Sequence, residues 1–209
     1  MHPSTLLSFD DGPGPSTPAL LDVLRVTSCR AMFFVLGSNL ARAMDVATRA
    51  VREGHVLGNH TYSHARPGAV SDAALIDEVE HTDALIREVY QLAAVPEPVS
   101  IPLRLPYGLE PQDVRGDVLA RLKRSHTGWT AILDDWRRPP PSPHALAGAM
   151  RRHIADRTAR GQDVLLCLHD GSRLAEARPA TVEAVRLLLS DPGWQTGELE
   201  NRNGRGAGQ

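Results

Sequence analysis

The chain is poor in aromatic residues, in lysine and in cysteine. Phe, Trp and Tyr occur three times each among 209 residues, so aliphatic side chains must form most of the core that the 42% hydrophobic content allows, and disorder throughout is excluded. Lys123 is the single lysine among 23 basic residues, and a net charge of −2 with a pI near 6.5 argues against an electrostatic nucleic-acid binder. The chain has no apolar run of about 18 residues, which argues against a membrane span.

The two cysteines, Cys29 and Cys167, lie far apart in apolar stretches and are expected to be buried free thiols. The first residues show neither a basic segment nor an apolar leader, so we expect a cytoplasmic protein. The length suits one domain, expected over residues 1–200, and the polar, Gly-rich residues 201–209 are expected to form a flexible tail.

Short apolar runs alternate with segments of helical periodicity along the chain. Strands are predicted over residues 5–9, 30–36, 56–58, 103–105, 128–133 and 163–168. Helices are predicted over residues 16–26, 40–53, 71–92, 111–123, 142–160 and 179–189. This alternation predicts an α/β fold with a parallel sheet or barrel, in which the chemistry lies at the carboxyl ends of the strands.

Polar residues follow several of these predicted strands: Asp10-Asp11, His60 with His64, Arg104, Asp134-Asp135-Trp136 and His169-Asp170. On a helical turn, the spacing of His60 and His64 would set both imidazoles on one face, within reach of one ion. Hydrogen-bonded histidines without a metal are the alternative. Adjacent carboxylates point apart on a strand, but a tight turn at Gly12-Pro13 would let Asp10 or Asp11 complete a site of two histidines and a carboxylate; a solvated turn is the alternative.

Five short motifs occur in an order that is typical of one family. They are SFDDGP at 8–13, GNHTYSH at 58–64, RLPYG at 104–108, DDW at 134–136 and LCLHD at 166–170. Together they resemble the polysaccharide deacetylase family, the NodB-homology proteins of carbohydrate esterase family 4. The resemblance implies a distorted (β/α) barrel of a single domain. It also implies a divalent metal, most often Zn²⁺, with Co²⁺, Ni²⁺ or Mn²⁺ as alternatives.

The resemblance also implies a role for each motif residue. Asp11, His60 and His64 would bind the metal, Asp10 would be the general base and His169 the general acid. Arg104 would hold Asp10, Asp135 would orient His169, and the backbone N–H of Tyr107 would stabilise the oxyanion. Pro106 and Trp136 would contact substrate, and Leu166 and Leu168 would line an apolar pocket for the acetyl methyl group. The remaining histidines, among them His55 and His126, are expected to be structural or exposed.

Two departures from the family pattern stand out. Ile132 falls where the fourth motif often carries an aspartate, which alters part of the polar network around Asp135. Ser8 replaces a more usual threonine.

These features predict a metal-dependent hydrolase that removes an acetyl group from an amino sugar, whether an oligosaccharide or a metabolite. One alternative is a deacylase of a non-carbohydrate N-acyl small molecule, and a second is a catalytically silent binding domain on the same scaffold. The expected partner is the substrate alone, with neither nucleic acid nor membrane, and the sequence leaves the oligomeric state open.

Overall fold

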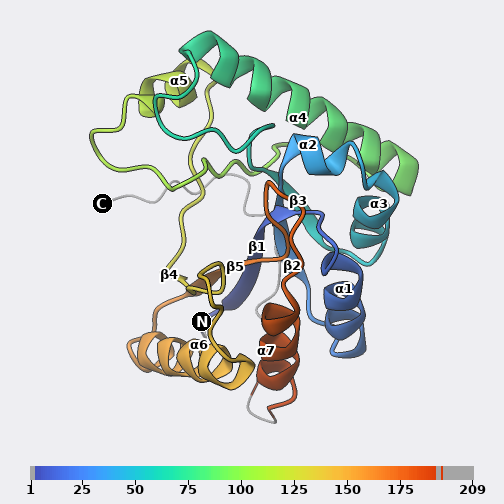
Figure 1. The fold of residues 1–209 in the computed structure, drawn as a ribbon, viewed down its shortest axis with the longest axis vertical. Coiled ribbons are helices and arrows are strands. Elements are labelled where there is room, and N and C mark those ends of the chain that lie inside the picture. Colours follow the sequence, from blue (N-terminus) through green and yellow to red (C-terminus); the bar gives the residue numbers. More distant parts are fainter. Residues whose placement is uncertain (1–2, 192–193, 195–209) are drawn as a thin grey trace.

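The computed structural model describes residues 3–191 and residue 194, so the predicted tail at 201–209 and part of 192–200 lie outside it. Five parallel strands form one sheet in the order β3-β2-β1-β5-β4 (Figure 1). The strands are β1 (Thr5–Gly12), β2 (Ala31–Val35), β3 (Val56–Asn59), β4 (Ala131–Ile132) and β5 (Val164–His169). The α/β class and the parallel sheet expected from the sequence are confirmed.

The two edges of this sheet approach one another through short backbone bridges. Leu103 pairs in parallel with Asn59 at the end of β3 and with His126 on its other side. The segment that begins at His126 then reaches β5, where the Thr130 N–H donates to the carbonyl of Leu165 at 2.8 Å. Leu103 therefore links β3 at one edge to residues 126–127, and the chain continues from there to β4 at the other edge, which gives the sheet the form of a distorted barrel.

Seven helices occur in the described part of the chain. They are α1 (Thr17–Val26), α2 (Gly37–Leu40), α3 (Met44–Arg52), α4 (Asp72–Ala93), α5 (Arg115–Arg121), α6 (Pro143–Ala159) and α7 (Pro179–Leu189). The larger ones follow one another around the sheet in the order α5, α4, α3, α1, α7, α6, each packed on the next (Figure 1). The long helix is capped as predicted, because the hydroxyl of Ser71 accepts from the Ala74 N–H.

Four predicted elements differ from the structure. The helix expected over 40–53 is two pieces, α2 and α3, separated by a turn at residues 41–43. Residues 103–105 make a single bridge instead of a strand, because Pro102 and Pro106 on either side lack the N–H that a longer ladder needs. The helix expected over 111–123 is reduced to α5, and the strand over 128–133 to β4.

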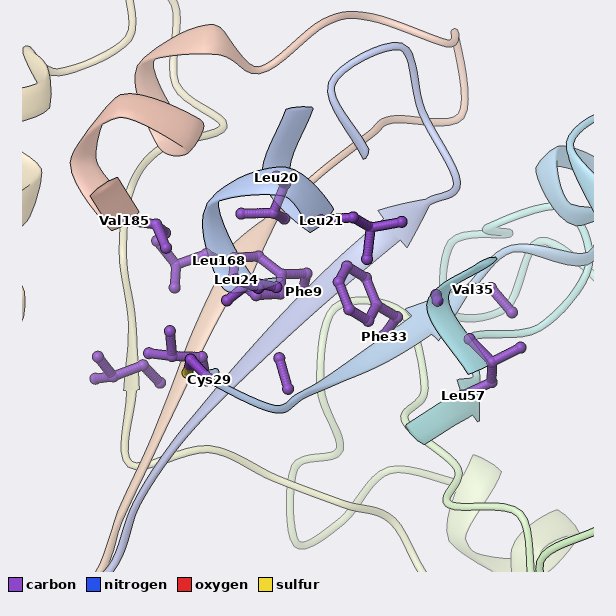
Figure 2. Packing of buried hydrophobic residues seen from close by; sticks show 14 of the residues in the cluster. Phe9, Leu20, Leu21, Leu24, Cys29, Phe33, Val35, Leu57, Leu168 and Val185 are labelled. Atoms are coloured by element: carbon purple, nitrogen blue, oxygen red, sulfur yellow. The ribbon is translucent and has the colours of Figure 1, made fainter. Parts of the chain in front are cut away.

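Successive side chains of β1 and β5 point alternately into the hydrophobic core under the helices and into the interior of the barrel. Leu7, Phe9, Leu166 and Leu168 belong to the main hydrophobic cluster, where Leu168 lies among Leu24, Phe9 and Val185 (Figure 2). The expectation that Leu166 and Leu168 line an acetyl pocket is therefore wrong. Both are fully buried on the helix-facing side of β5, and the intervening Cys167 faces the barrel interior.

Both cysteines are free and buried, as predicted. No helix in the described residues has the length and apolar character that crossing a membrane requires. The expected cytoplasmic location stays a prediction.

Candidate active site

Two adjacent aspartates reach the same site because β1 bulges at its end. The register of β1 against β2 shifts between Asp10 and Gly12, and Asp11 takes a left-handed backbone conformation with φ of 70°. The Asn39 side-chain amide donates to the Asp11 carbonyl at 2.8 Å and holds this geometry. The predicted convergence of the two carboxylates is thus produced by an extra residue in the strand.

The two histidines are brought together by a loop and not by the helical turn that their spacing suggested. Residues 60–64 contain no helix, and both Thr61 and His64 have left-handed φ values of 64° and 58°. Asn59 supports the loop by accepting from the Thr61 N–H at 2.8 Å. Strained backbone of this kind persists where surrounding contacts determine it, and it is common at functional sites.

The cluster of Asp11, His60 and His64 has the donor set and geometry that suit a divalent cation. Asp11 Oδ1 lies 3.4 Å from His60 Nε2 and 3.2 Å from His64 Nε2, and this buried oxygen has no hydrogen-bond donor among the described residues. The carbonyl of Arg104 lies 2.7 Å from His60 Nδ1, so that nitrogen carries the proton and Nε2 presents a lone pair. Burial lowers the pKa of His64 to about 4 against the opposing charge of Asp11, which favours the neutral imidazole that binds metals.

Asp10 is held as a carboxylate by a fully buried arginine. Arg104 Nη1 donates to Asp10 Oδ1 at 2.6 Å and to Ser8 Oγ at 2.9 Å. Burial alone would raise the pKa of Asp10, but the charges of Arg104, His60 and His169 and the hydrogen bond from Arg104 together outweigh it, so the pKa lies below its usual value. Asp10 Oδ2 faces the histidines, 3.8 Å from His60 Nε2.

His169, in contrast to the ionised Asp10, is stabilised in its protonated form. Its Nδ1 lies 2.8 Å from Asp135 Oδ1, and Asp135 Oδ2 accepts from both the His169 N–H and the Thr181 hydroxyl, each at 2.8 Å. Burial would lower the pKa of His169, but the hydrogen bond and charge of Asp135 raise it to about 9. The imidazolium form, which can donate a proton, is therefore favoured at neutral pH.

The side chains of Asp10, Asp11, His60, His64 and His169 line one cleft of about 400 Å³. Its lining residues are Asp10, Asp11, His60, His64, Leu105, Tyr107, Trp129, Ile132, Trp136, His169, Ser172, Arg173, Leu174, Glu176 and Arg178. Of the predicted substrate contacts, Tyr107 and Trp136 lie on its surface. Pro106 does not, because it is buried and its carbonyl accepts from Arg115 at 2.8 Å.

Tyr107 offers a backbone donor at the cleft. Its φ of 65° is left-handed, and its N–H donates to no acceptor within the described chain. Its ring packs edge-on to His64 with a centroid separation of 4.8 Å, which fixes the residue beside the histidines.

The sequence assigned no role in the site to two residues close to Asp10. The thiol of Cys167 lies 3.3 Å from Asp10 Oδ2, and counting alternate positions back from His169 on β5 could have found it. Asp170 is fully buried, and its Oδ2 accepts from the Thr17 hydroxyl. Burial raises the pKa of Asp170 to about 7, and no pattern in the sequence indicates this contact with α1.

Comparison with known proteins identifies the family. A family model described as polysaccharide deacetylase matches residues 2–123, more than half of the chain. The chitooligosaccharide deacetylase of Bradyrhizobium sp. (strain ANU 289) is 34% identical over 179 residues, covering 85% of this chain and 75% of that protein. The chain belongs to the polysaccharide deacetylase family.

More distant members of the polysaccharide deacetylase family agree with this placement. A peptidoglycan-N-acetylglucosamine deacetylase of Bacillus cereus is 28% identical over 88% of this chain, which spans 63% of that protein. The solved family 4 carbohydrate esterase from Streptomyces lividans, in complex with acetate, superposes with a TM-score of 0.71 at 25% identity, covering 97% of this chain and 96% of the other. Asp135 and His169 lie beyond the segment that the family model matches; His169 lines the cleft, and Asp135 contacts it from the buried side.

Proposed function

We propose that this member of the polysaccharide deacetylase family is a metal-dependent N-deacetylase of an amino sugar, carried by a glycan fragment or by a metabolite. The observation that carries the proposal is the shared cleft, in which the Asp11–His60–His64 cluster lies with a carboxylate of lowered pKa and an imidazole of raised pKa. Relatives named chitooligosaccharide and peptidoglycan-N-acetylglucosamine deacetylases support this substrate class.

The residues of the cleft can divide the proton transfers of amide hydrolysis between them. Asp10 Oδ2 accepts a proton from the water molecule that attacks the acyl carbon, while Arg104 holds the other carboxylate oxygen. The Tyr107 N–H donates to the oxyanion of the tetrahedral intermediate. His169 Nε2 then gives its proton to the nitrogen, the C–N bond breaks, and the acyl group leaves as acetate with a free amine on the sugar.

Asp11, His60 and His64 would hold a divalent ion, which would supply Lewis acidity to the water and to the substrate carbonyl. Zn²⁺ suits two imidazole nitrogens and one carboxylate, and this ligand number leaves positions for water and substrate. Co²⁺, Ni²⁺ and Mn²⁺ are alternatives at the same ligands.

Metal binding is testable without any substrate. Adding Zn²⁺ to EDTA-treated protein should raise the melting temperature, because a ligand that binds only the folded state stabilises it by about 4 kcal/mol at a thousand times its dissociation constant. The His60→Ala variant should lose this gain, whereas variant His144→Ala, at an exposed residue of α6, should keep it. A gain of equal size in the His60→Ala variant would contradict the assigned ligands.

The reaction is tested by acetate release from chitooligosaccharides and from a panel of N-acetylated small molecules, using the metal-loaded enzyme. The wild type should release acetate, and the Asp10→Asn variant should lose about 10²- to 10⁴-fold in kcat, the range expected for a general base. Release from non-carbohydrate small molecules alone would favour the deacylase of a non-carbohydrate N-acyl compound, and binding without release would favour the catalytically silent domain.

A further inference from the structure

Exposed apolar side chains gather at the catalytic cleft. Eight large hydrophobic residues are exposed in the described part of the chain, and four of them line this cleft: Tyr107, Ile132, Trp136 and Leu174. Since isolated exposed hydrophobics are ordinary, the informative observation is that half of them meet in one place.

Three of the four come from one side of the barrel. Ile132 ends β4 and is 42% exposed, Trp136 follows in the next loop at 47%, and Leu174 lies in the loop after β5 at 70%. Because β4 and β5 are paired in the sheet, these three residues lie at neighbouring strand ends. We refer to Ile132, Trp136 and Leu174 as the apolar wall.

The charges beside the apolar wall do not favour a cationic ligand. Two carboxylates beside it are paired with arginines, Asp134 with Arg137 at 3.1 Å and Glu176 with Arg138 at 2.7 Å. Arg173, beside Leu174, has no carboxylate partner among the described residues. An ammonium group, such as an already deacetylated neighbouring sugar would carry, therefore meets an unpaired arginine and two paired carboxylates beside the wall, which gives it no favourable partner there.

The chemistry of the wall also distinguishes an apolar group from a second sugar. A tryptophan ring alone would suit the face of a pyranose, but the aliphatic side chains of Ile132 and Leu174 offer no partner to hydroxyl groups. Covering a hydroxyl without a hydrogen bond is unfavourable, whereas covering an alkyl or aryl group is favourable in proportion to its area.

We propose that the apolar wall binds an aryl or alkyl group linked to the amino sugar whose acetamide is hydrolysed beside it. This inference rests on the proposed function and specifies its substrate class as an N-acetyl amino sugar with an apolar aglycone. Ile132 and Leu174 are then the residues that determine specificity for that aglycone.

The experiment compares three substrates of the zinc-loaded enzyme: methyl N-acetyl-β-glucosaminide, its phenyl counterpart and di-N-acetylchitobiose. We expect kcat/KM for the phenyl glycoside to exceed that for the methyl glycoside by about tenfold, mostly through KM, as burial of an aromatic ring predicts. The Ile132→Asp and Leu174→Ser variants should each reduce this ratio several-fold. Variant Val99→Ser provides the matched control, because Val99 is 93% exposed and lies outside the cleft.

The outcomes separate this inference from the proposed function. Equal kcat/KM for the methyl and phenyl glycosides would overturn the inference and leave the deacetylase intact. A preference for chitobiose that the Ile132→Asp variant loses would also overturn it, since a second sugar would then occupy the apolar wall. Absence of acetate from all three substrates would overturn the proposed function itself.

Discussion

Asp135 is bound to His169 by both of its oxygens, and this pair sets the charge of the proposed acid. Its Oδ1 contacts the ring and its Oδ2 accepts from the His169 backbone, so the carboxylate fixes the orientation of the imidazole as well as its protonation. The aspartate has 1% exposure, which keeps its charge effective over this short distance.

The Asp135→Asn variant should therefore shift the pH dependence of catalysis. His169 has a raised pKa, so its acid form is present below about pH 9 and is lost above it. Removing the carboxylate charge lowers that pKa, and the alkaline limb of kcat/KM should move to lower pH. The matched control is variant Asp134→Asn, at the neighbouring partly exposed aspartate, which should leave the limb in place. An unmoved limb in the Asp135→Asn variant would contradict the assignment of His169 as the acid.

Cys167 gives a second prediction at this scale. Its fully buried thiol can donate to Asp10 Oδ2, the oxygen that faces the histidines. The Cys167→Val variant keeps the volume but removes the donor, and should lower kcat several-fold with little change in KM. The Cys167→Ser variant retains a donor and should recover most of this loss. Equal rates in the two variants would show that the thiol only fills space.

At the scale of the elements, the apolar runs of the sequence predicted most strands of the sheet. Apolar runs located β1, β2, β3 and β5, and the polar residues at the ends of β1, β3 and β5 do meet at one end of the barrel. The sequence could not show how Asp10 and Asp11 converge, since a bulge depends on pairing with a neighbouring strand. It also suggested a helical turn for His60 and His64, because an i, i+4 spacing does not distinguish a helix from a bent loop.

Gly12 shows how tightly the end of β1 is packed. A Cβ added there would lie 2.3 Å from Asp170 Oδ2, so the Gly12→Ala variant should lose about 2 kcal/mol or more of unfolding free energy. Gly116 in α5 has nothing within 4 Å of such a Cβ, and variant Gly116→Ala should gain about 0.5 kcal/mol. Urea unfolding of the EDTA-treated proteins measures both. A Gly12→Ala variant as stable as the wild type would contradict the described packing.

At the scale of the whole molecule, the resemblance to the family predicted a barrel, and the structure adds how this chain closes it. Arg104 lies at the seam, where it donates to the carbonyls of Thr127 and Gly128 as well as to Asp10. No local pattern predicts this, because the partners are separated by 23 to 94 residues in the chain. The assignment of Leu166 and Leu168 failed for a related reason: an apolar motif does not state which face of its strand is the core.

Far from the cleft, His55 should make stability depend on pH. Burial, with the charges of Arg30 and Arg49, lowers its pKa to about 4 from 6.5. The folded state therefore favours neutral His55. The contribution of His55 to the free energy of unfolding is fully present above pH 6.5 and decreases as the pH falls toward 4. The loss should reach about 3 kcal/mol.

Urea unfolding in EDTA, repeated between pH 4 and 7, measures this loss. The His55→Gln variant should show a shallower decline than the wild type, and variant His144→Gln should match the wild type because His144 is exposed. Parallel declines in the wild type and in the His55→Gln variant would assign the acid sensitivity to other groups.

Because of the bulge at Asp11, the site depends on the number of residues in β1 as well as on their side chains. Deleting one residue there would restore an unbroken ladder with β2 and leave a single carboxylate for the two tasks of proton acceptor and ligand. No substitution elsewhere could restore the second. Transplanting this chemistry onto another parallel barrel would therefore require inserting a residue into the host strand, and copying the side chains alone would fail.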